Sequence, residues 1–206
     1  MNHRFITFEG GEGAGKTTLI DALEKMLISQ GHSVLKVREP GGTCLGEAIR
    51  SLLLHHEMPI SPYAELSLFL ASRAQHISEI IGQALAEGKI VLCDRFNDST
   101  IAYQGAARGL GMEEVAAFCR FICQGLEPDL TLYLDIDPKI GLQRASARHK
   151  SDRIEAEGLA FHIAIREAFL AIHRKNPSRV CLLDANQPPE QVFQQAILSF
   201  NQGTVK

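Results

Sequence analysis

The sequence predicts an α/β domain in which a parallel β-sheet is covered by helices on both faces. Short, nearly continuous apolar stretches alternate along the chain with longer segments that repeat apolar residues at helical spacing. Strands of a parallel sheet are buried on both faces, so they read as continuous apolar runs. The chain also carries no internal repeat, low-complexity segment or evident linker, and 206 residues suit a single domain spanning 1–206.

Five stretches have the composition of buried strands. In chain order they are RFITFE (4–9), SVLKVR (33–38), KIVLCD (89–94), LTLYLDI (130–136) and RVCLLD (179–184). Because a helical segment follows each of the first four, successive strands should run parallel and be joined by crossover helices.

The helices carry local start and stop signals. Apolar residues at helical spacing follow the first strand and stop at Gly31, a typical C-terminal cap. Ser61 is a favourable N-terminal cap, and Pro62 suits the first turn that follows it. Asp137 and Pro138 repeat this pair of signals after the fourth strand.

Composition restricts the class of protein. Hydrophobic residues make up 45% of the chain and charged residues 22%, and the formal net charge of −3 argues against a nucleic-acid-binding protein. The five cysteines lack CxxC spacing, which favours reduced thiols. With neither a signal peptide nor an apolar run long enough for a membrane span, we expect a cytoplasmic protein that does not bind membranes.

A phosphate-binding loop follows the first strand. Gly10, Gly15, Lys16 and Thr17 satisfy the P-loop pattern between an apolar strand and an amphipathic helix, so a chance glycine-rich turn is a poor alternative. Backbone N–H groups of such a loop cradle phosphates, while the lysine reaches the β- and γ-phosphates and the threonine ligates Mg²⁺. The predicted ATP site comprises Gly10, Gly11, Glu12, Gly13, Ala14, Gly15, Lys16, Thr17 and Thr18.

The P-loop alone leaves GTPases, motor ATPases and kinases open. Neither an NKxD-type guanine motif nor an LSGGQ signature is present. The chain does contain REPGGT (38–43), DRFNDSTIAYQGAAR (94–108) and DRIE (152–155). Together with FEGGEGAGKTT these motifs resemble the signature set of bacterial thymidylate kinases, in the same order and over nearly all 206 residues.

The resemblance implies the nucleoside monophosphate kinase fold with strand order 2-3-1-4-5 and a lid at about 143–157. It implies transfer of the γ-phosphate of ATP to thymidine monophosphate (dTMP), with Mg²⁺ as cofactor. It also implies a homodimer, for which the helix containing Cys119 and Cys123 is a candidate interface. The acceptor is itself a phosphate with a second pKa of about 6, so no strong general base is required.

The resemblance also assigns the dTMP site. Phe69 would stack on thymine, Arg73 would bind a base carbonyl, Tyr103 would exclude a ribose 2′-hydroxyl and Arg95 would grip the acceptor phosphate. The alternatives are a core position for Phe69, simple packing for Tyr103 and a buried structural ion pair for Arg95. The implied set is Glu12, Glu39, Phe69, Arg73, Arg95, Ser99, Thr100, Tyr103 and Gln104.

On the donor side, Asp94 resembles a Walker-B acid that organises Mg²⁺ with Thr17; a helix cap is its alternative. Gly13 stands where one version of the family has a basic P-loop residue, so cations should come from the lid. The run 143–153 is basic, although such runs are usually solvated loops. The implied catalytic residues are Lys16, Arg95, Arg148 and Arg153, and the implied adenine-side residues are Arg144 and Asn186.

Glu12 places a carboxylate inside a loop for polyanions. We expect it to point away from the triphosphate, toward the acceptor, rather than into solvent; the resemblance places the 3′-hydroxyl of the deoxyribose there. Two other functions remain open at this point: a kinase for another nucleoside monophosphate, and a P-loop module that binds nucleotide without phosphoryl transfer.

Overall fold

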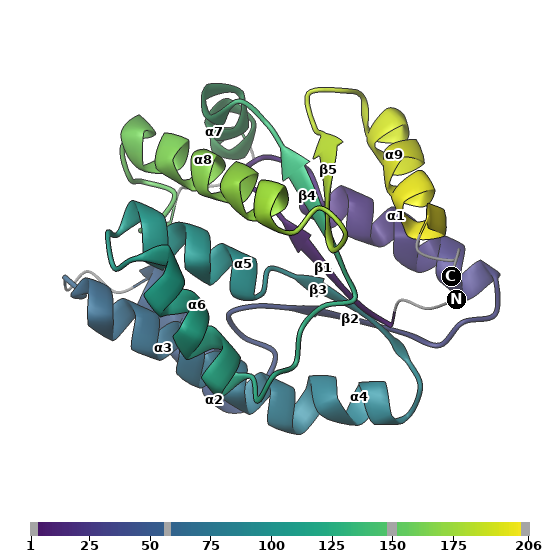
Figure 1. Cartoon of the computed structure of the whole chain (residues 1–206), viewed down its shortest axis with the longest axis horizontal. Coiled ribbons are helices and arrows are strands. Elements are labelled where there is room, and N and C mark those ends of the chain that lie inside the picture. The colour runs from purple at the N-terminus through teal and green to yellow at the C-terminus, as the bar shows by residue number, and fades with distance from the viewer. Residues whose placement is uncertain (1–3, 56–58, 148–151, 203–206) are drawn as a thin grey trace.

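The computed structural model describes residues 4–55, 59–147 and 152–202. Its centre is a five-stranded parallel sheet of order β2-β3-β1-β4-β5, as expected (Figure 1). The strands are β1 (Phe5–Glu9), β2 (Val34–Arg38), β3 (Ile90–Asp94), β4 (Leu130–Asp135) and β5 (Val180–Asp184). All five predicted strands are therefore present, each shorter by one residue at one end.

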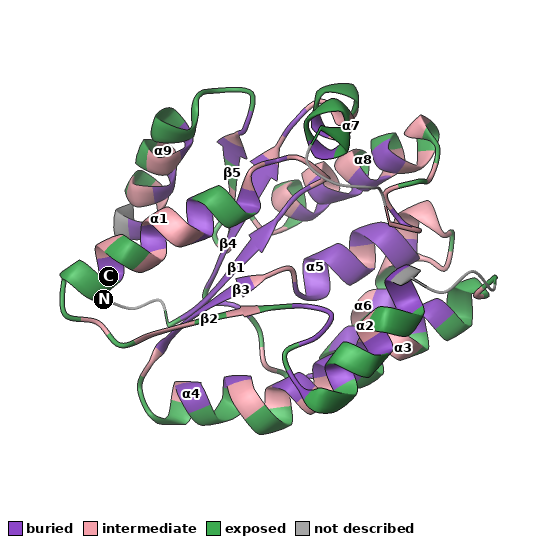
Figure 2. Ribbon diagram, turned by 180° about the vertical axis from the view of Figure 1, so that it is seen from behind, coloured by how far each residue is buried: buried purple, intermediate pink, exposed green. Residues whose placement is uncertain are grey.

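Side chains alternate between the two faces of the sheet. Ile6 and Phe8 of β1 pack with apolar residues of α1 (Lys16–Ser29) and α9 (Pro189–Gln202). Phe5 belongs to a separate core on the opposite face, as the period of two in a strand requires. The three central strands are almost wholly buried, whereas β2 at the edge is partly exposed (Figure 2).

Helices cover both faces, as predicted. In Figure 1, α1 and α9 lie side by side, while α8 (Leu159–Lys175) packs on the other face against β4 and β5. Beyond that layer lie α2 (Cys44–His55), α3 (Pro62–His76) and α6 (Met112–Ile122); α4 (Gly82–Ala86) packs on β3, and α7 (Pro138–Ser146) follows β4.

The predicted helix caps are confirmed. The Ser61 hydroxyl accepts a hydrogen bond from the Ala64 N–H, and the Asp137 carboxylate accepts one from the Lys139 N–H. Gly31 follows the end of α1 with φ 85°, a left-handed conformation that glycine adopts without strain.

Two segments form π-helical turns instead of regular α-helix. They are η1 (Ile77–Ile81), which continues α3, and η2 (Ile101–Ala107), which continues the short α5 (Asn97–Thr100). π-Helical turns occur frequently at functional sites, and hydrophobic periodicity does not distinguish them from α-helix. In the described ranges, no helix combines the length and the apolar character needed to span a membrane.

Candidate active site

A cavity of about 290 Å³ lies at the carboxyl ends of the strands. Parallel strands bring their C-terminal loops to one edge of a sheet, where α/β proteins bind ligands. Residues from the P-loop and from the predicted acceptor site line the same cavity. Of the predicted residues they are Glu12, Gly13, Ala14, Gly15, Lys16, Thr17, Glu39, Phe69, Arg73, Asp94, Arg95, Ser99, Thr100, Tyr103 and Gln104.

The P-loop is closely packed against α7. A Cβ atom on Gly13 would lie 2.1 Å from the carbonyl oxygen of Gly141, and one on Gly141 would lie 2.3 Å from that of Glu12. Gly13 also has φ 65°, in the left-handed region. Position 13 therefore has no room for any side chain here. In one version of the family that the sequence resembles, a basic residue stands at this position.

Lys16 is the first residue of α1 and is buried at the base of the loop. Its ammonium group donates to the carbonyl oxygens of Gly10 and Gly11 at 3.1 and 3.0 Å. Burial and the nearby Arg95 guanidinium lower the pKa of Lys16. The hydroxyl-bearing Thr17 and Thr18 follow it in the exposed first turn of the helix.

Asp94, at the end of β3, carries an orphaned polar atom. Its Oδ1 is buried and has no hydrogen-bond partner among the described residues, although Asp94 lines the cavity together with Thr17. Mg²⁺ takes oxygen ligands, carboxylates among them, and in phosphate-binding loops it is also held by the threonine hydroxyl. The donor set at this edge therefore fits a magnesium ion.

Arg95 adopts a left-handed backbone conformation, with φ 70°. Such a conformation costs a non-glycine residue about 1–3 kcal/mol and often marks a functional position. Its guanidinium donates to the Gly10 carbonyl at 3.0 Å, to the Ser99 hydroxyl at 3.2 Å and to Glu12 at 2.6 Å. The ion pair expected as the alternative to a phosphate contact is thus present, and it lines the cavity.

Glu12 points toward the acceptor-side residues and not into solvent. Its side chain is 16% exposed, and its Oε1 accepts hydrogen bonds from Arg95 and from the Tyr103 hydroxyl at 2.9 Å. Although burial opposes ionisation, the charges of Arg95 and Lys16 lower the pKa of Glu12 to about 2. The loop carboxylate is therefore ionised at neutral pH and paired with two residues of the predicted acceptor site.

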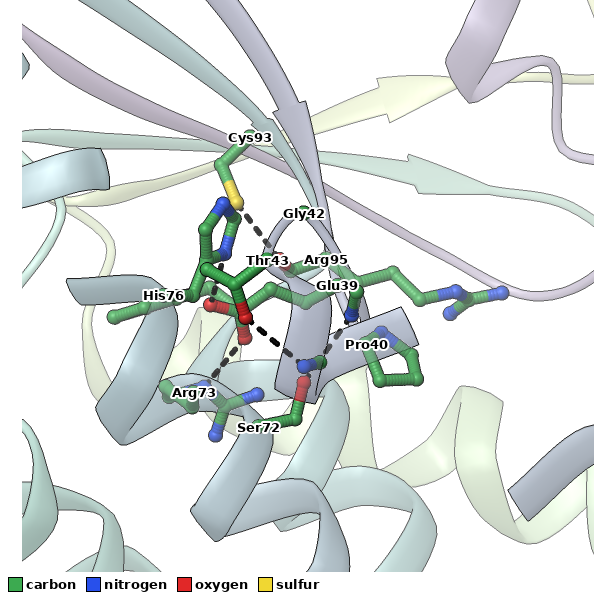
Figure 3. Close-up of polar contacts among 12 residues, drawn as sticks. Glu39, Pro40, Gly42, Thr43, Ser72, Arg73, His76, Cys93 and Arg95 are labelled. Carbon is green, nitrogen blue, oxygen red and sulfur yellow. Dashed lines mark hydrogen bonds and ion pairs between the residues drawn. The ribbon is translucent and has the colours of Figure 1, made fainter. Parts of the chain in front are cut away.

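Arg73 is buried and held on several sides. Its Nε donates to Glu39 at 2.6 Å, and its Nη1 donates to Asn97 at 3.0 Å and Thr100 at 2.9 Å. Figure 3 shows Arg73 reaching from its helix to the Glu39 carboxylate. Burial disfavours the charged guanidinium, but the Glu39 carboxylate outweighs this effect and raises the pKa of Arg73. Phe69, one turn earlier in α3, is only partly buried and faces the cavity.

Glu65, also in α3, gathers three partners. It is 1% exposed and accepts hydrogen bonds from Gln104 at 2.9 Å, Arg108 at 3.1 Å and Arg153 at 2.6 Å. The Gln104 amide, predicted to edge the base, is therefore bonded to Glu65 while its residue lines the cavity. This cluster could not be predicted from the sequence because its members lie far apart along the chain.

Of the predicted lid and adenine-side residues, Arg144 lies beside the predicted adenine loop, whereas Arg153 is bonded to Glu65. Arg144 donates to the Ala185 carbonyl at 3.0 Å, which brings it beside the loop that contains Asn186. Arg153 donates to Glu65 and to the Leu53 carbonyl at 2.8 Å, and it is not among the residues that line the cavity. Arg148 lies outside the described residues.

Sequence reasoning missed several residues at the cavity. Arg50 of α2 lines it and donates to the Pro40 carbonyl at 2.9 Å. Arg38, the first residue of REPGGT, lines it too, so that motif could have indicated it. Asp152 and Glu155 line it from the DRIE motif, whereas only Arg153 was predicted there.

Another missed residue, Glu9, contacts the cavity-lining residue Ser99. It ends β1, is 0% exposed, and accepts hydrogen bonds from the Phe96 N–H at 2.8 Å and the Ser99 hydroxyl. Burial and the negative charge of Asp98 raise the pKa of Glu9 from its usual value of 4.5 to about 8. Glu9 thus connects the strand that leads into the P-loop to the segment that contains Arg95 and Ser99.

The raised pKa of Glu9 predicts a pH-dependent stability. Between about pH 4.5 and 8 the folded protein keeps a proton on Glu9 that the unfolded chain has lost, so the free energy of unfolding should fall as pH rises. Glu9→Gln cannot titrate and lacks this slope. Thermal unfolding of both proteins at pH 5.5 and 8.5 should show the wild type losing stability relative to Glu9→Gln; a constant difference would contradict the prediction.

Comparison with known proteins decides the family. A family model described as "Thymidylate kinase" matches residues 8–196. The chain belongs to the thymidylate kinase family. Among its relatives, the thymidylate kinase of Protochlamydia amoebophila (strain UWE25) is 52% identical over 202 residues, covering 94% of this chain and 90% of the relative. That of Pseudomonas fluorescens (strain SBW25) is also 52% identical, over 198 residues, covering 96% and 94%.

A solved structure agrees. The crystal structure of thymidylate kinase from Ehrlichia chaffeensis matches with a TM-score of 0.79 and 32% identity, over 95% of this chain and 97% of that one. The expected nucleoside monophosphate kinase fold is confirmed. The chain is thus a phosphotransferase that moves the γ-phosphate of ATP to dTMP, and the non-catalytic alternative is not favoured.

Proposed function

We propose that the cavity holds the two nucleotides end to end, with the Glu12–Arg95 pair at the boundary between them. The observation that carries this proposal is the position of Glu12. A residue of the phosphate loop turns its carboxylate away from the loop and pairs it with acceptor-side groups. This orientation removes the conflict between a P-loop carboxylate and a triphosphate.

The residue roles follow from charge and position. Residues 10–18 bind the ATP phosphates, with Lys16 on the transferred group. Arg95 binds the acceptor phosphate. Burial disfavours its charged form, but the negative charge of Glu12 outweighs this effect and raises the pKa of Arg95, so the guanidinium keeps its positive charge. Phe69 stacks on thymine, and Arg73 donates to a base carbonyl. The remaining acceptor contacts are those of Glu39, Ser99, Thr100, Tyr103 and Gln104.

Mg²⁺ is the proposed cofactor, held by Thr17 and Asp94. When bound, the ion neutralises phosphate charge during transfer. The chain's own residues bring two polyanions together in line and exclude water from the γ-phosphate, and the ionised acceptor phosphate attacks without a general base.

For the lid at about 143–157 we propose a donor-side role. We propose that this chain is of the version of the family whose cations come from the lid, and the lack of space for a side chain at Gly13 supports this proposal. Arg144 borders the adenine with Asn186, a role supported by its bond to Ala185. Arg148 and Arg153 are the proposed catalytic cations, and Arg153 must exchange Glu65 for a phosphate to act.

We also propose a cytoplasmic homodimer of single-domain subunits that acts on ATP and dTMP and binds neither nucleic acid nor membranes. Helix α6 supports the dimer. Cys119 is buried, but Phe118 and Phe121 are 55% and 79% exposed. Two exposed aromatic side chains on one helix suit a contact with a second copy of the chain.

A mutant-by-substrate cycle tests the proposed role of Glu12. If its carboxylate accepts a hydrogen bond from the 3′-hydroxyl, the kcat/KM of the wild type should be lower on 3′-deoxy-dTMP than on dTMP. The difference should correspond to about 1.5–3 kcal/mol of transition-state binding free energy. Glu12→Gln should lose much of the same increment on dTMP but less on the 3′-deoxy acceptor. Its weakened pairing with Arg95 affects both acceptors and cancels in the cycle. Simple additivity of the two losses would show that Glu12 does not contact the hydroxyl.

A further inference from the structure

His76 is a fully buried polar residue that the proposed function does not use. It ends α3 and is 0% exposed. Its Nδ1 lies 3.1 Å from Oε1 of Glu39, and its Nε2 has no hydrogen-bond partner among the described residues. Buried polar groups generally have partners, so a buried imidazole with one bonded and one unbonded nitrogen calls for an explanation.

The hydrogen bond defines the tautomer of the ring. A carboxylate only accepts hydrogen bonds, so Nδ1 must carry the proton that lies between it and Glu39. With the proton on Nδ1, the Nε2 atom is a bare acceptor and leaves no donor unpaired. Nε2 faces Gly42, where a Cβ atom would lie 2.6 Å away, so the loop backbone packs directly on the ring.

The Glu39 carboxylate is consequently fixed at both oxygens. His76 binds Oε1 and Arg73 binds Oε2, and the two donors lie three residues apart on one face of α3 (Figure 3). A carboxylate bonded at one oxygen only could rotate about its terminal torsion, which is broad. The second bond removes that freedom.

Fixing Glu39 in turn fixes Arg73. Three of the five guanidinium N–H groups are used, one by Glu39 and two by Asn97 and Thr100. The guanidinium carbon also lies 4.9 Å from the centroid of the Phe96 ring. No hydrogen bond to a described residue uses Nη2, so its two N–H groups are the ones left for a ligand in the cavity that Arg73 lines.

We infer that His76 is a positioning residue for recognition of the acceptor base: through Glu39 it aims the free Nη2 group of Arg73 at the base carbonyl. The inference rests on the proposed contact between Arg73 and thymine. His76 touches neither nucleotide in this scheme. Its effect should therefore be confined to the acceptor and to the identity of the base, with the ATP site unaffected.

The test compares dTMP with 5-methyl-dCMP, in which an amino group replaces the 4-carbonyl. His76→Phe replaces the imidazole with an aromatic ring that has no N–H, so it should raise KM for dTMP about tenfold or more. It should also lower the ratio of kcat/KM between dTMP and 5-methyl-dCMP at least fivefold, while KM for ATP stays within twofold. His76→Asn can present an amide N–H near the Nδ1 position and should restore most of both; His76→Gln, whose longer amide reaches toward Gly42, should not.

Two further variants separate the possible failures. Ser72→Ala removes the other side-chain contact from this face of α3 to the loop, the hydroxyl that accepts from the Gly41 N–H at 3.2 Å, and should leave the base ratio unchanged. Arg73→Lys should collapse the ratio. If Arg73→Lys leaves it intact, the proposed thymine contact is wrong and the inference falls with it. If Arg73→Lys lowers the ratio of kcat/KM between dTMP and 5-methyl-dCMP but His76→Phe does not, the inference alone is overturned. The same holds if His76→Asn lowers this ratio as much as His76→Phe does.

Discussion

Arg95→Ala should lower kcat for phosphoryl transfer by a factor on the order of 10²–10³, the effect of losing one fixed contact to charge in the transition state. The side chain bridges Gly10 of the P-loop and Glu12 and Ser99 on the acceptor side. Its removal leaves Glu12 buried without its cation, so a carboxylate would then oppose the approach of the acceptor phosphate. Steady-state kinetics with dTMP as the varied substrate measure the loss.

Two control variants show whether the loss of kcat comes from the guanidinium of Arg95. Arg95→Lys keeps the charge but not the planar fork, and it should recover only part of the activity. Arg174→Ala removes an exposed arginine of α8 and should leave kcat unchanged. If Arg95→Ala keeps its kcat but unfolds at a lower temperature, the ion pair with Glu12 is structural and the phosphate contact is wrong.

Lys16→Met should cause a loss in kcat of the same order, about 10²–10³, for a different reason. The buried ammonium group is bonded to the Gly10 and Gly11 carbonyls and is the cation of the phosphate loop. Methionine has a similar length but neither charge nor donors. Single-turnover transfer from ATP measures the loss directly.

The matched control is Lys25→Met, which removes an exposed lysine from the same helix and should not affect transfer. Because Lys16 serves the donor, KM for dTMP in Lys16→Met should change far less than kcat. Activity of Lys16→Met within tenfold of wild type would be incompatible with a phosphate-binding role for this loop.

The sheet could be predicted from the sequence because each strand has its own apolar signal and each cap its own residues. Ser61 and Asp137 are local signals, and the structure confirms both. The order of the strands in the sheet could not be predicted in this way. Periodicity does not give it, and it came from the resemblance of motifs such as REPGGT and FEGGEGAGKTT to a known family.

The parts that could not be predicted depend on contacts between distant segments. The close approach of Gly13 and Gly141 joins the P-loop to α7 across more than 120 residues, and it explains why position 13 lacks a side chain. The burial of Glu9 and the pairing of His76 with Glu39 likewise depend on tertiary packing. For Arg153, the basic run indicated a phosphate ligand, but in the fold Glu65 competes for the same guanidinium.

The proposed function depends most on one cavity that binds both nucleotides and whose acceptor half is specific for thymine. Single-turnover transfer from γ-labelled ATP to a panel of monophosphates (dTMP, dUMP, 5-methyl-dCMP, dAMP and dGMP) tests this directly. We expect fast labelling of dTMP and slower labelling of dUMP, with the other three at least about a hundredfold below dTMP because unpaired polar groups would be buried with them. Equal labelling of a purine monophosphate, or ATP consumption that does not depend on the acceptor, would contradict the account.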